Sequence, residues 1–190
     1  NIPVVSWLVL FGRCRHCKEP ISIQYPMIEV LCAALWVAAV WYYALTLQAV
    51  TAGVFGTLLL GIGVTDARHY LIPDEYTLGG LLVGLVLAFR GGPAGVVAAV
   101  IGAALGFGLL FAVGWLGGKL LKKEAMGGGD IKMMAMVGTF VGWKGVLLTV
   151  FGGALLGTVI FVPISLLTKG ERLVPFGVFL AAAAAITFEI

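Results

Sequence analysis

The sequence predicts an all-α protein whose helices form a polytopic transmembrane bundle. The chain of 190 residues is 61% hydrophobic and 11% charged, whereas soluble domains carry about 25% charged residues. Its mean hydropathy is +1.10. Apolar runs recur along the chain, and its length accommodates about seven membrane segments of roughly 20 residues each. This composition excludes an ordinary soluble domain, and the net charge of +3 is not a nucleic-acid-binding signature.

The first 27 residues are the polar part of the chain. They contain Arg13, Arg15, His16 and Lys18 together with three prolines, which indicates irregular structure outside the bilayer. We interpret residues 1–27 as a short cytoplasmic loop segment, and residues 28–190 as the transmembrane domain. No charged region of a secretory signal is evident and Met is absent at position 1, so we expect a cut or processed start.

Seven apolar runs follow the loop segment, at 28–47, 50–65, 77–89, 95–117, 131–142, 145–167 and 174–190. Several are shorter than a straight span needs, so we expect helices that extend through their flanks, tilt or cross only part of the bilayer. Small residues recur four apart, as at Gly102 and Gly106 and at Gly153 and Gly157. This spacing predicts helices that pack at close range.

The basic residues favour this arrangement of crossings. With residues 1–27 in the cytoplasm and seven crossings, every Lys and Arg except Arg90 and Lys144 falls on the cytoplasmic side. The positive-inside rule predicts such a bias. Asp66, Asp74 and Asp130 then lie at the cytoplasmic face of the membrane.

Asp66 and Asp130 are the candidate catalytic residues. The chain has only nine Asp and Glu residues, and a carboxylate at the end of a membrane segment is costly because its charge loses water. Two close carboxylates share one proton. The ionised member can take a proton from water while the protonated member polarises a carbonyl and helps protonate the leaving amine. The pair therefore predicts peptide hydrolysis.

The residues before Asp130 suit this chemistry. Gly127, Gly128 and Gly129 form a stretch without side chains, along which a substrate backbone can approach. A structural alternative for Asp130 is that it caps a helix starting at Ile131.

Structural alternatives also exist for the other acids. Asp66 could pair with Arg68 at a helix end. Asp74 follows Pro73 and could cap the helix that starts at Glu75, or it could replace Asp66 as the partner of Asp130.

Two segments resemble the active-site motifs of one family. Gly127-Gly128-Gly129-Asp130-Ile131-Lys132 resembles the GxGD signature of intramembrane aspartyl proteases. The segment from Asp66 to Asp74 resembles the other active-site segment of the type IV prepilin peptidases, and the spacing of 64 residues between the aspartates suits them. The opening residues, including Cys14-Arg15-His16-Cys17, are also similar, so the resemblance covers nearly the whole chain.

This resemblance implies a specific activity. Such enzymes cleave the leader of type IV prepilins and type II secretion pseudopilins after a glycine, at the cytoplasmic face of the bacterial inner membrane. Many also methylate the new N-terminus with S-adenosylmethionine. By matching positions, Asp66 and Asp130 would be the catalytic pair, with Gly127, Gly128, Gly129, Lys132, Arg68 and Asp74 in the substrate-binding or active-site loops.

The cysteines depart from the family pattern. Many members carry two CxxC pairs, whose four thiolates can hold a structural zinc ion in a closed tetrahedral site. This chain has one such pair, Cys14 and Cys17, while Cys32 lies in an apolar run. We therefore expect zinc binding only with further cysteines that would precede Asn1. Proteolysis itself requires no cofactor.

Two other classes of function compete with a peptidase. A proton-coupled transporter would use Asp66 and Asp130 as relay groups, but it would need acids deeper in the spans and preferably internal repeats, and the sequence shows neither. A non-catalytic membrane scaffold would use both aspartates only as helix caps, and serine substitutions should then preserve its function.

Overall fold

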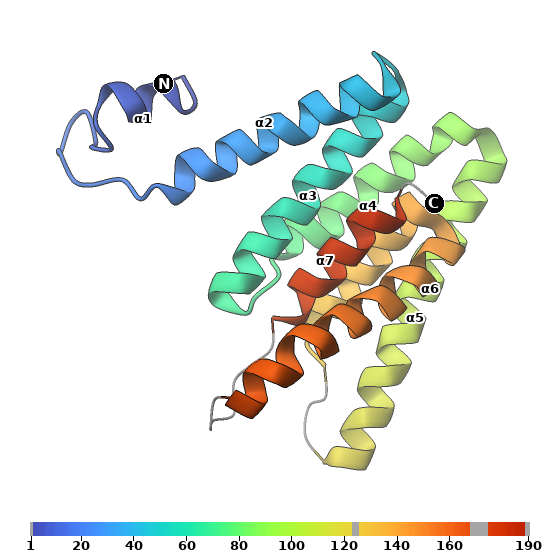
Figure 1. Cartoon of the computed structure of the whole chain (residues 1–190). Coiled ribbons are helices and arrows are strands. Elements are labelled where there is room, and N and C mark those ends of the chain that lie inside the picture. Colours follow the sequence, from blue (N-terminus) through green and yellow to red (C-terminus); the bar gives the residue numbers. More distant parts are fainter. Residues whose placement is uncertain (1, 123–125, 168–174, 189–190) are drawn as a thin grey trace. The chain divides into compact units, whose positions relative to one another are not determined.

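The computed structural model describes residues 2–122, 126–167 and 175–188. Within these ranges the secondary structure consists of helices and one isolated β-bridge between Arg13 and Pro20, which confirms the predicted all-α class. The elements, labelled in Figure 1, are α1 (Val5–Val9), α2 (Gln24–Tyr43), α3 (Leu47–His69), α4 (Asp74–Ala88), the 3-10 turn η1 (Phe89–Gly91), α5 (Gly92–Leu121), α6 (Gly128–Leu167) and α7 (Phe176–Thr187).

The chain divides into two compact units, Asn1–Thr57 and Leu58–Ile190, and the boundary falls within α3. The domain boundary expected after residue 27 stays a prediction. Within the segment predicted to be irregular, α1 forms a short helix, and α2 begins at Gln24 rather than at residue 28.

Four helical stretches among the described residues are long and apolar enough to cross a membrane, which makes this a polytopic membrane protein. They are Gln24–Tyr43, Leu47–His69, Asp74–Leu120 and Gly128–Ile160. The shorter apolar helix α7 has 12 residues and extends about 18 Å, against a hydrocarbon core of about 30 Å.

Glycines interrupt two of these long stretches. Gly92 has a φ of 63° and separates α4 and η1 from the rest of α5, while Gly142 has a φ of 68° inside α6. The second interruption lies where the sequence separates the runs 131–142 and 145–167. The count of seven crossings is not confirmed, and Lys123, Lys169 and Arg172, which contributed to the charge bias, lie outside the described residues.

In the first unit, α2 packs on the beginning of α3. The indole Nε1 of Trp36 donates a hydrogen bond to Thr57 Oγ1 at 3.1 Å. A Cβ at Gly53 would lie 2.7 Å from the Trp36 ring, so the missing side chain makes room for this indole. Nearer the N-terminus, the backbone N–H of Val4 donates to Glu29 Oε2 at 2.6 Å.

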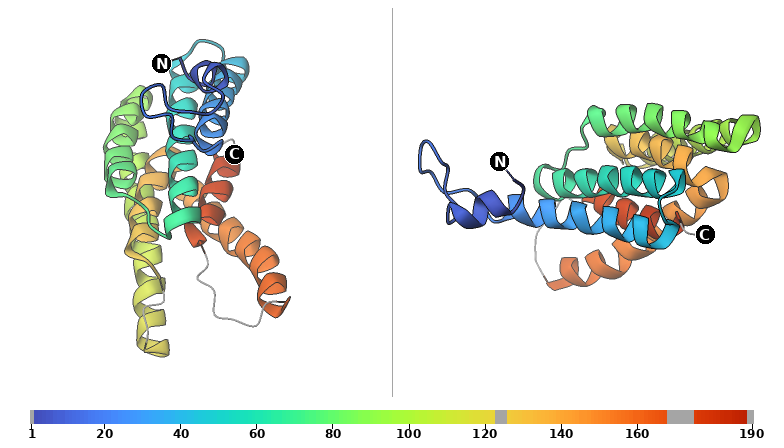
Figure 2. Two further views of the ribbon diagram at one scale, coloured as in Figure 1. Left: turned by 90° about the vertical axis from the view of Figure 1, so that its left-hand side faces the viewer. Right: turned by 90° about the horizontal axis from the view of Figure 1, so that it is seen from above.

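In the second unit, α5 and the first half of α6 lie in backbone contact (Figures 1 and 2). A Cβ at Gly102 would collide with the carbonyl oxygen of Gly138, and a Cβ at Gly138 would collide with that of Gly102. One helical turn further along α5, a Cβ at Gly106 would collide with the carbonyl oxygen of Met134. The close packing predicted from the glycine spacing is therefore confirmed for this pair of helices.

Helix α7 packs against the second half of α6. A Cβ at Gly153 would lie 2.8 Å from Leu180 Cδ2, and the buried hydroxyls of Thr149 and Thr187 are hydrogen-bonded at 2.7 Å. Because α6 contacts both α5 and α7, the core of this unit fixes the beginnings of α6 and α7 within one body.

Candidate active site

Asp66 lies in the last turn of α3, and its residue is only 6% exposed. Its Oδ2 accepts a hydrogen bond from the backbone N–H of Val178 at 3.1 Å, across 112 positions of sequence. Val178 is the third residue of α7, so Asp66 pairs with a different helix and not with Arg68, whose residue is exposed.

Asp130 lies in the first turn of α6. The helix begins at Gly128, so Asp130 is its third residue and does not cap a helix that starts at Ile131. Its Oδ1 is buried and forms no hydrogen bond with any described residue. Among the described residues, it is the one buried side-chain oxygen or nitrogen atom that lacks a hydrogen-bond partner.

The structure brings together the helix turns that carry the two carboxylates. Ile72, which is buried, lies against the backbone beside each of them. A Cβ at Gly177 would lie 2.8 Å from Ile72 Cδ1, and a Cβ at Gly129 would lie 3.0 Å from Ile72 Cβ. The end of α3, the beginning of α6 and the beginning of α7 therefore converge around one side chain.

Asp74 and Lys132 form a separate feature of this region. Lys132 Nζ contacts Asp74 Oδ1 at 2.7 Å and Oδ2 at 2.9 Å, with the two side chains 41% and 54% exposed. Asp74 is the first residue of α4 and Pro73 is its N-cap residue, so the capping interpretation of Asp74 is wrong. The ion pair joins the beginnings of α4 and α6.

Gly127 lies beside the carboxylate of Asp130. Gly127 and Gly128 are exposed, and a Cβ at Gly127 would lie 3.5 Å from Asp130 Oδ2. A substrate backbone approaching along this segment would meet Asp130 without an intervening side chain.

Gly177 and Val178 were not among the site residues predicted from the sequence. Pro175 and Gly177 precede an apolar run, which is a recognisable helix-start pattern. No sequence rule connects such a pattern with an acid 112 positions earlier, so only the packing of α7 reveals the contact.

The second candidate site lies in the first unit. Cys14 is half-buried and Cys17 is exposed. The backbone N–H groups of Cys17 and His16 lower the pKa of the Cys14 thiol, with further contributions from the Cys17 side chain and Lys18. Among the described residues no group of three or more His, Cys, Asp or Glu side chains could hold a metal ion, so these two thiols alone do not complete a zinc site.

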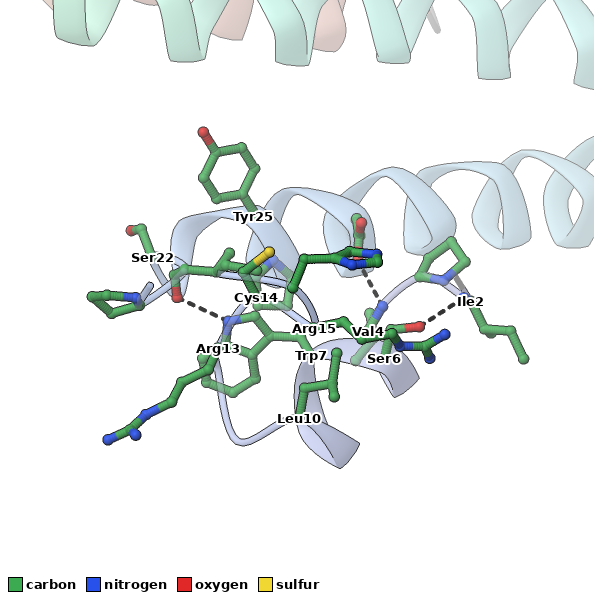
Figure 3. Close-up of a pocket in the computed structure, with 16 residues that line it drawn as sticks. Ile2, Val4, Ser6, Trp7, Leu10, Arg13, Cys14, Arg15, Ser22 and Tyr25 are labelled. Atoms are coloured by element: carbon green, nitrogen blue, oxygen red, sulfur yellow. Dashed lines mark hydrogen bonds between the residues drawn. The ribbon is translucent and has the colours of Figure 1, made fainter. Parts of the chain in front are cut away.

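A cavity of about 950 Å³ lies beside Cys14 (Figure 3). Its walls come from the loop segment and the first turns of α2, and Trp7 Nε1 donates to the carbonyl oxygen of Ile21 at 3.0 Å within it. The lining includes aromatic, cationic and acidic side chains, among them Trp7, Arg13, Arg15, His16, Tyr25 and Glu29.

Comparisons with known proteins match both parts of the chain. Residues 53–162 match the family model described as the type IV leader peptidase family, and residues 1–43 match the bacterial peptidase A24 N-terminal domain. No solved structure matches the chain.

Several relatives carry the name prepilin leader peptidase/N-methyltransferase. The protein from Xanthomonas campestris pv. campestris is 39% identical over 99% of this chain and 66% of its own length. The relatives from Pseudomonas putida and Pseudomonas aeruginosa are 36% and 37% identical, each over 96% of this chain and 64% of its own length. The chain thus spans slightly less than two thirds of the length of these relatives.

Proposed function

Because the chain belongs to the type IV leader peptidase family, we propose that it is a membrane-embedded aspartic endopeptidase. Its proposed substrates are type IV prepilins and pseudopilins, cleaved after a glycine at the cytoplasmic face of the bacterial inner membrane. The observation that carries this proposal is the convergence of the end of α3, with Asp66, and the beginning of α6, with Asp130, on the buried side chain of Ile72. The buried, unpaired Oδ1 of Asp130 supports it further.

The proposed mechanism uses the two carboxylates and one water molecule. The ionised carboxylate removes a proton from water, and the oxygen of that water attacks the carbonyl carbon of the scissile peptide bond. The protonated carboxylic acid donates a hydrogen bond to the carbonyl oxygen as charge develops on it. The C–N bond then breaks, the amine leaves with a proton from the site, and the leader ends in a new carboxyl group.

Cleavage of a synthetic prepilin by purified protein in detergent tests this proposal. We expect Asp66→Asn and Asp130→Asn each to lower kcat by about 100-fold or more, as is typical for loss of a general acid or base. Asp74→Asn is the matched control, because it removes a nearby carboxylate that the proposal leaves out of the chemistry. Full activity of either of the first two variants would rule out the dyad. Loss in both Asp130→Asn and Asp74→Asn, with full activity of Asp66→Asn, would make Asp74 the partner of Asp130.

Nothing in the comparisons or in the described residues favours the transporter alternative. It would require a proton flux in proteoliposomes that Asp130→Asn abolishes, together with no cleavage of prepilin by the wild-type protein.

Methylation of the new N-terminus is a second proposed activity, favoured by the cavity in the first unit and by the names of the relatives. S-adenosylmethionine would supply the methyl group. The cavity lies within the size range of small-molecule sites, Trp7 and Tyr25 offer aromatic faces for a sulfonium, and Arg13 or Arg15 offers a cation for a carboxylate. Calorimetry should detect binding of S-adenosylmethionine that Trp7→Ala weakens, while prepilin cleavage is retained.

A further inference from the structure

We infer that the first turn of α7 is a positioning element for Asp66, with Gly177 as the positioning residue and the N–H of Val178 as the donor that orients the carboxylate. This inference rests on the proposed function, since it assigns a role to Asp66 in catalysis. It adds two residues of α7 to a site that the sequence motifs confine to α3 and α6.

The first line of evidence is steric. Gly177 is buried, and other side chains occupy the space beside its Cα. A Cβ at this position would lie 2.9 Å from Asp66 Oδ2, 3.1 Å from Asp66 Cγ and 2.8 Å from Ile72 Cδ1. The carboxylate of Asp66 therefore occupies the place that any other residue at position 177 would need for its side chain. Only glycine lets Asp66 lie against the backbone of α7 without moving.

The electrostatic evidence concerns the ends of the two helices. Asp66 lies at the carboxyl end of α3, where the helix dipole is unfavourable for a negative charge, whereas Val178 lies at the amino end of α7, where it is favourable. The N–H of Val178 is shared between two acceptors, the carbonyl oxygen of Pro175 at 3.2 Å and Asp66 Oδ2 at 3.1 Å, an arrangement common at helix termini. Asp66 thus adds a second acceptor at the start of α7, and α7 supplies the donor that a buried carboxylate requires.

The packing of α7 gives this contact a fixed base. Gly153 of α6 lies against Leu180, and the Thr149–Thr187 hydrogen bond joins the same two helices near the other end of α7. Asp130 is carried by the first half of α6. The orientation of Asp66 relative to Asp130 therefore depends on α7 as well as on α3, although α7 contributes no side chain to the reaction.

The test compares Gly177→Ala with Gly53→Ala in the cleavage assay. The two substitutions create similar steric conflicts, with closest contacts of 2.8 Å and 2.7 Å, but only the first involves Asp66 or α7. We expect similar losses of thermal stability. Gly177→Ala should lower kcat by at least about 10-fold with KM changed less than about 2-fold, because small misplacements of a reacting group are costly. Gly53→Ala should keep kcat within about 2-fold of the wild type.

A second variant tests the donor directly. Replacement of the peptide bond between Gly177 and Val178 by an ester removes the N–H without adding an atom, and an ester at the next bond, between Val178 and Phe179, is its control. We expect the first ester to lower kcat about 10-fold relative to the second. This pair carries the test if Gly177→Ala does not yield folded protein.

The outcomes separate this inference from the proposed function. Wild-type cleavage together with equal kcat values for the two alanine variants, or for the two esters, would overturn the positioning role and leave the peptidase in place. Absence of cleavage by the wild-type protein would overturn the proposed function, and with it the catalytic role of Asp66 that α7 is inferred to support.

Discussion

The end of α3 and the beginning of α6 each present one aspartate, but the two helix ends treat their carboxylates differently. Asp66 is almost completely buried at the carboxyl end of its helix and is bonded to α7. Asp130 lies in the first turn of its helix, where the dipole favours an acid, and its Oδ1 is bonded to no described residue. The fold therefore holds one carboxylate in place and leaves a buried oxygen of the other without a hydrogen-bond partner among the described residues.

The two carboxylates are therefore held in position by different contacts. The position of Asp66 depends on a contact between helices, whereas the position of Asp130 depends on its own helix and on the backbone packing of α5 against α6. Substitutions at the end of α3 and at the beginning of α6 should consequently have different effects on stability even where they lower activity equally.

The largest difference should come from alanine substitutions of the two aspartates. Both Asp66→Ala and Asp130→Ala should lower cleavage by about 100-fold or more. Asp66→Ala should also destabilise the protein by about 1 kcal/mol, because the N–H of Val178 loses its bond to Asp66 and keeps only the carbonyl oxygen of Pro175 as an acceptor. Asp130→Ala should not destabilise it, because an unpaired buried oxygen is removed. Thermal unfolding in detergent measures this, and equal destabilisation by both would contradict the comparison.

The support of Asp130 by α5 can be broken at Gly102. Gly102→Val should destabilise the protein by about 1–3 kcal/mol and lower cleavage, since the new side chain meets the rigid backbone of Gly138. Gly108→Val, also in α5, is the control because no atom lies within 4 Å of a Cβ there. Thermal unfolding and the rate of prepilin cleavage should be measured for both variants. A larger loss in Gly102→Val would show that the backbone contact with α6, and not the loss of a glycine from α5, causes the effect. Equal stability of the two would contradict this.

The support of Asp66 by α7 can be weakened at a distance through Thr149. Thr149→Val removes the buried bond to Thr187 and should cost about 1 kcal/mol, with a small decrease in kcat. Thr158→Val is a suitable control, since the hydroxyl of Thr158 bonds only to the carbonyl oxygen of Ala154 in its own helix among the interactions of the described residues. Chemical or thermal unfolding should separate the two variants, and identical curves would indicate that the Thr149 bond does not anchor α7.

The smallest effect is expected at the ion pair between Asp74 and Lys132. Both side chains are substantially exposed, so Lys132→Met should cost at most about 1 kcal/mol, and less at high salt. The exchange of both residues, Asp74→Lys with Lys132→Asp, should restore the stability of the wild type. A large salt-independent loss in Lys132→Met would instead show that Lys132 supports Asp130 directly.

Much of the fold could be predicted from apolar runs and glycines. The runs located α2 to α7 approximately, and the spacing of Gly102 and Gly106 predicted close helix packing, although not that α6 is the partner. Boundaries were less accurate, because helices continue through polar residues such as Gln24 and Asp130. Helix lengths by themselves do not establish the number of crossings, since φ values at Gly92 and Gly142 bend helices that composition alone leaves continuous.

The candidate site was predicted in part. Motif positions identified Asp66 and Asp130, and they suggested Asp74 as a cap or a rival partner. The structure pairs Asp74 with Lys132 and makes Pro73 the N-cap residue of α4, so the capping interpretation is wrong. The role of Asp74 as a rival partner of Asp130 stays a prediction.

The sequence by itself determined the membrane character of this chain, its helical class and the two acids, because composition, hydropathy and short motifs are local properties. Only the tertiary structure decided that Val178 is the partner of Asp66 and that Asp130 retains an unpaired oxygen. The first result depends on where α7 packs, and glycines and hydroxyls spread over α6 and α7 set that packing together. No local pattern encodes the sum of such contacts.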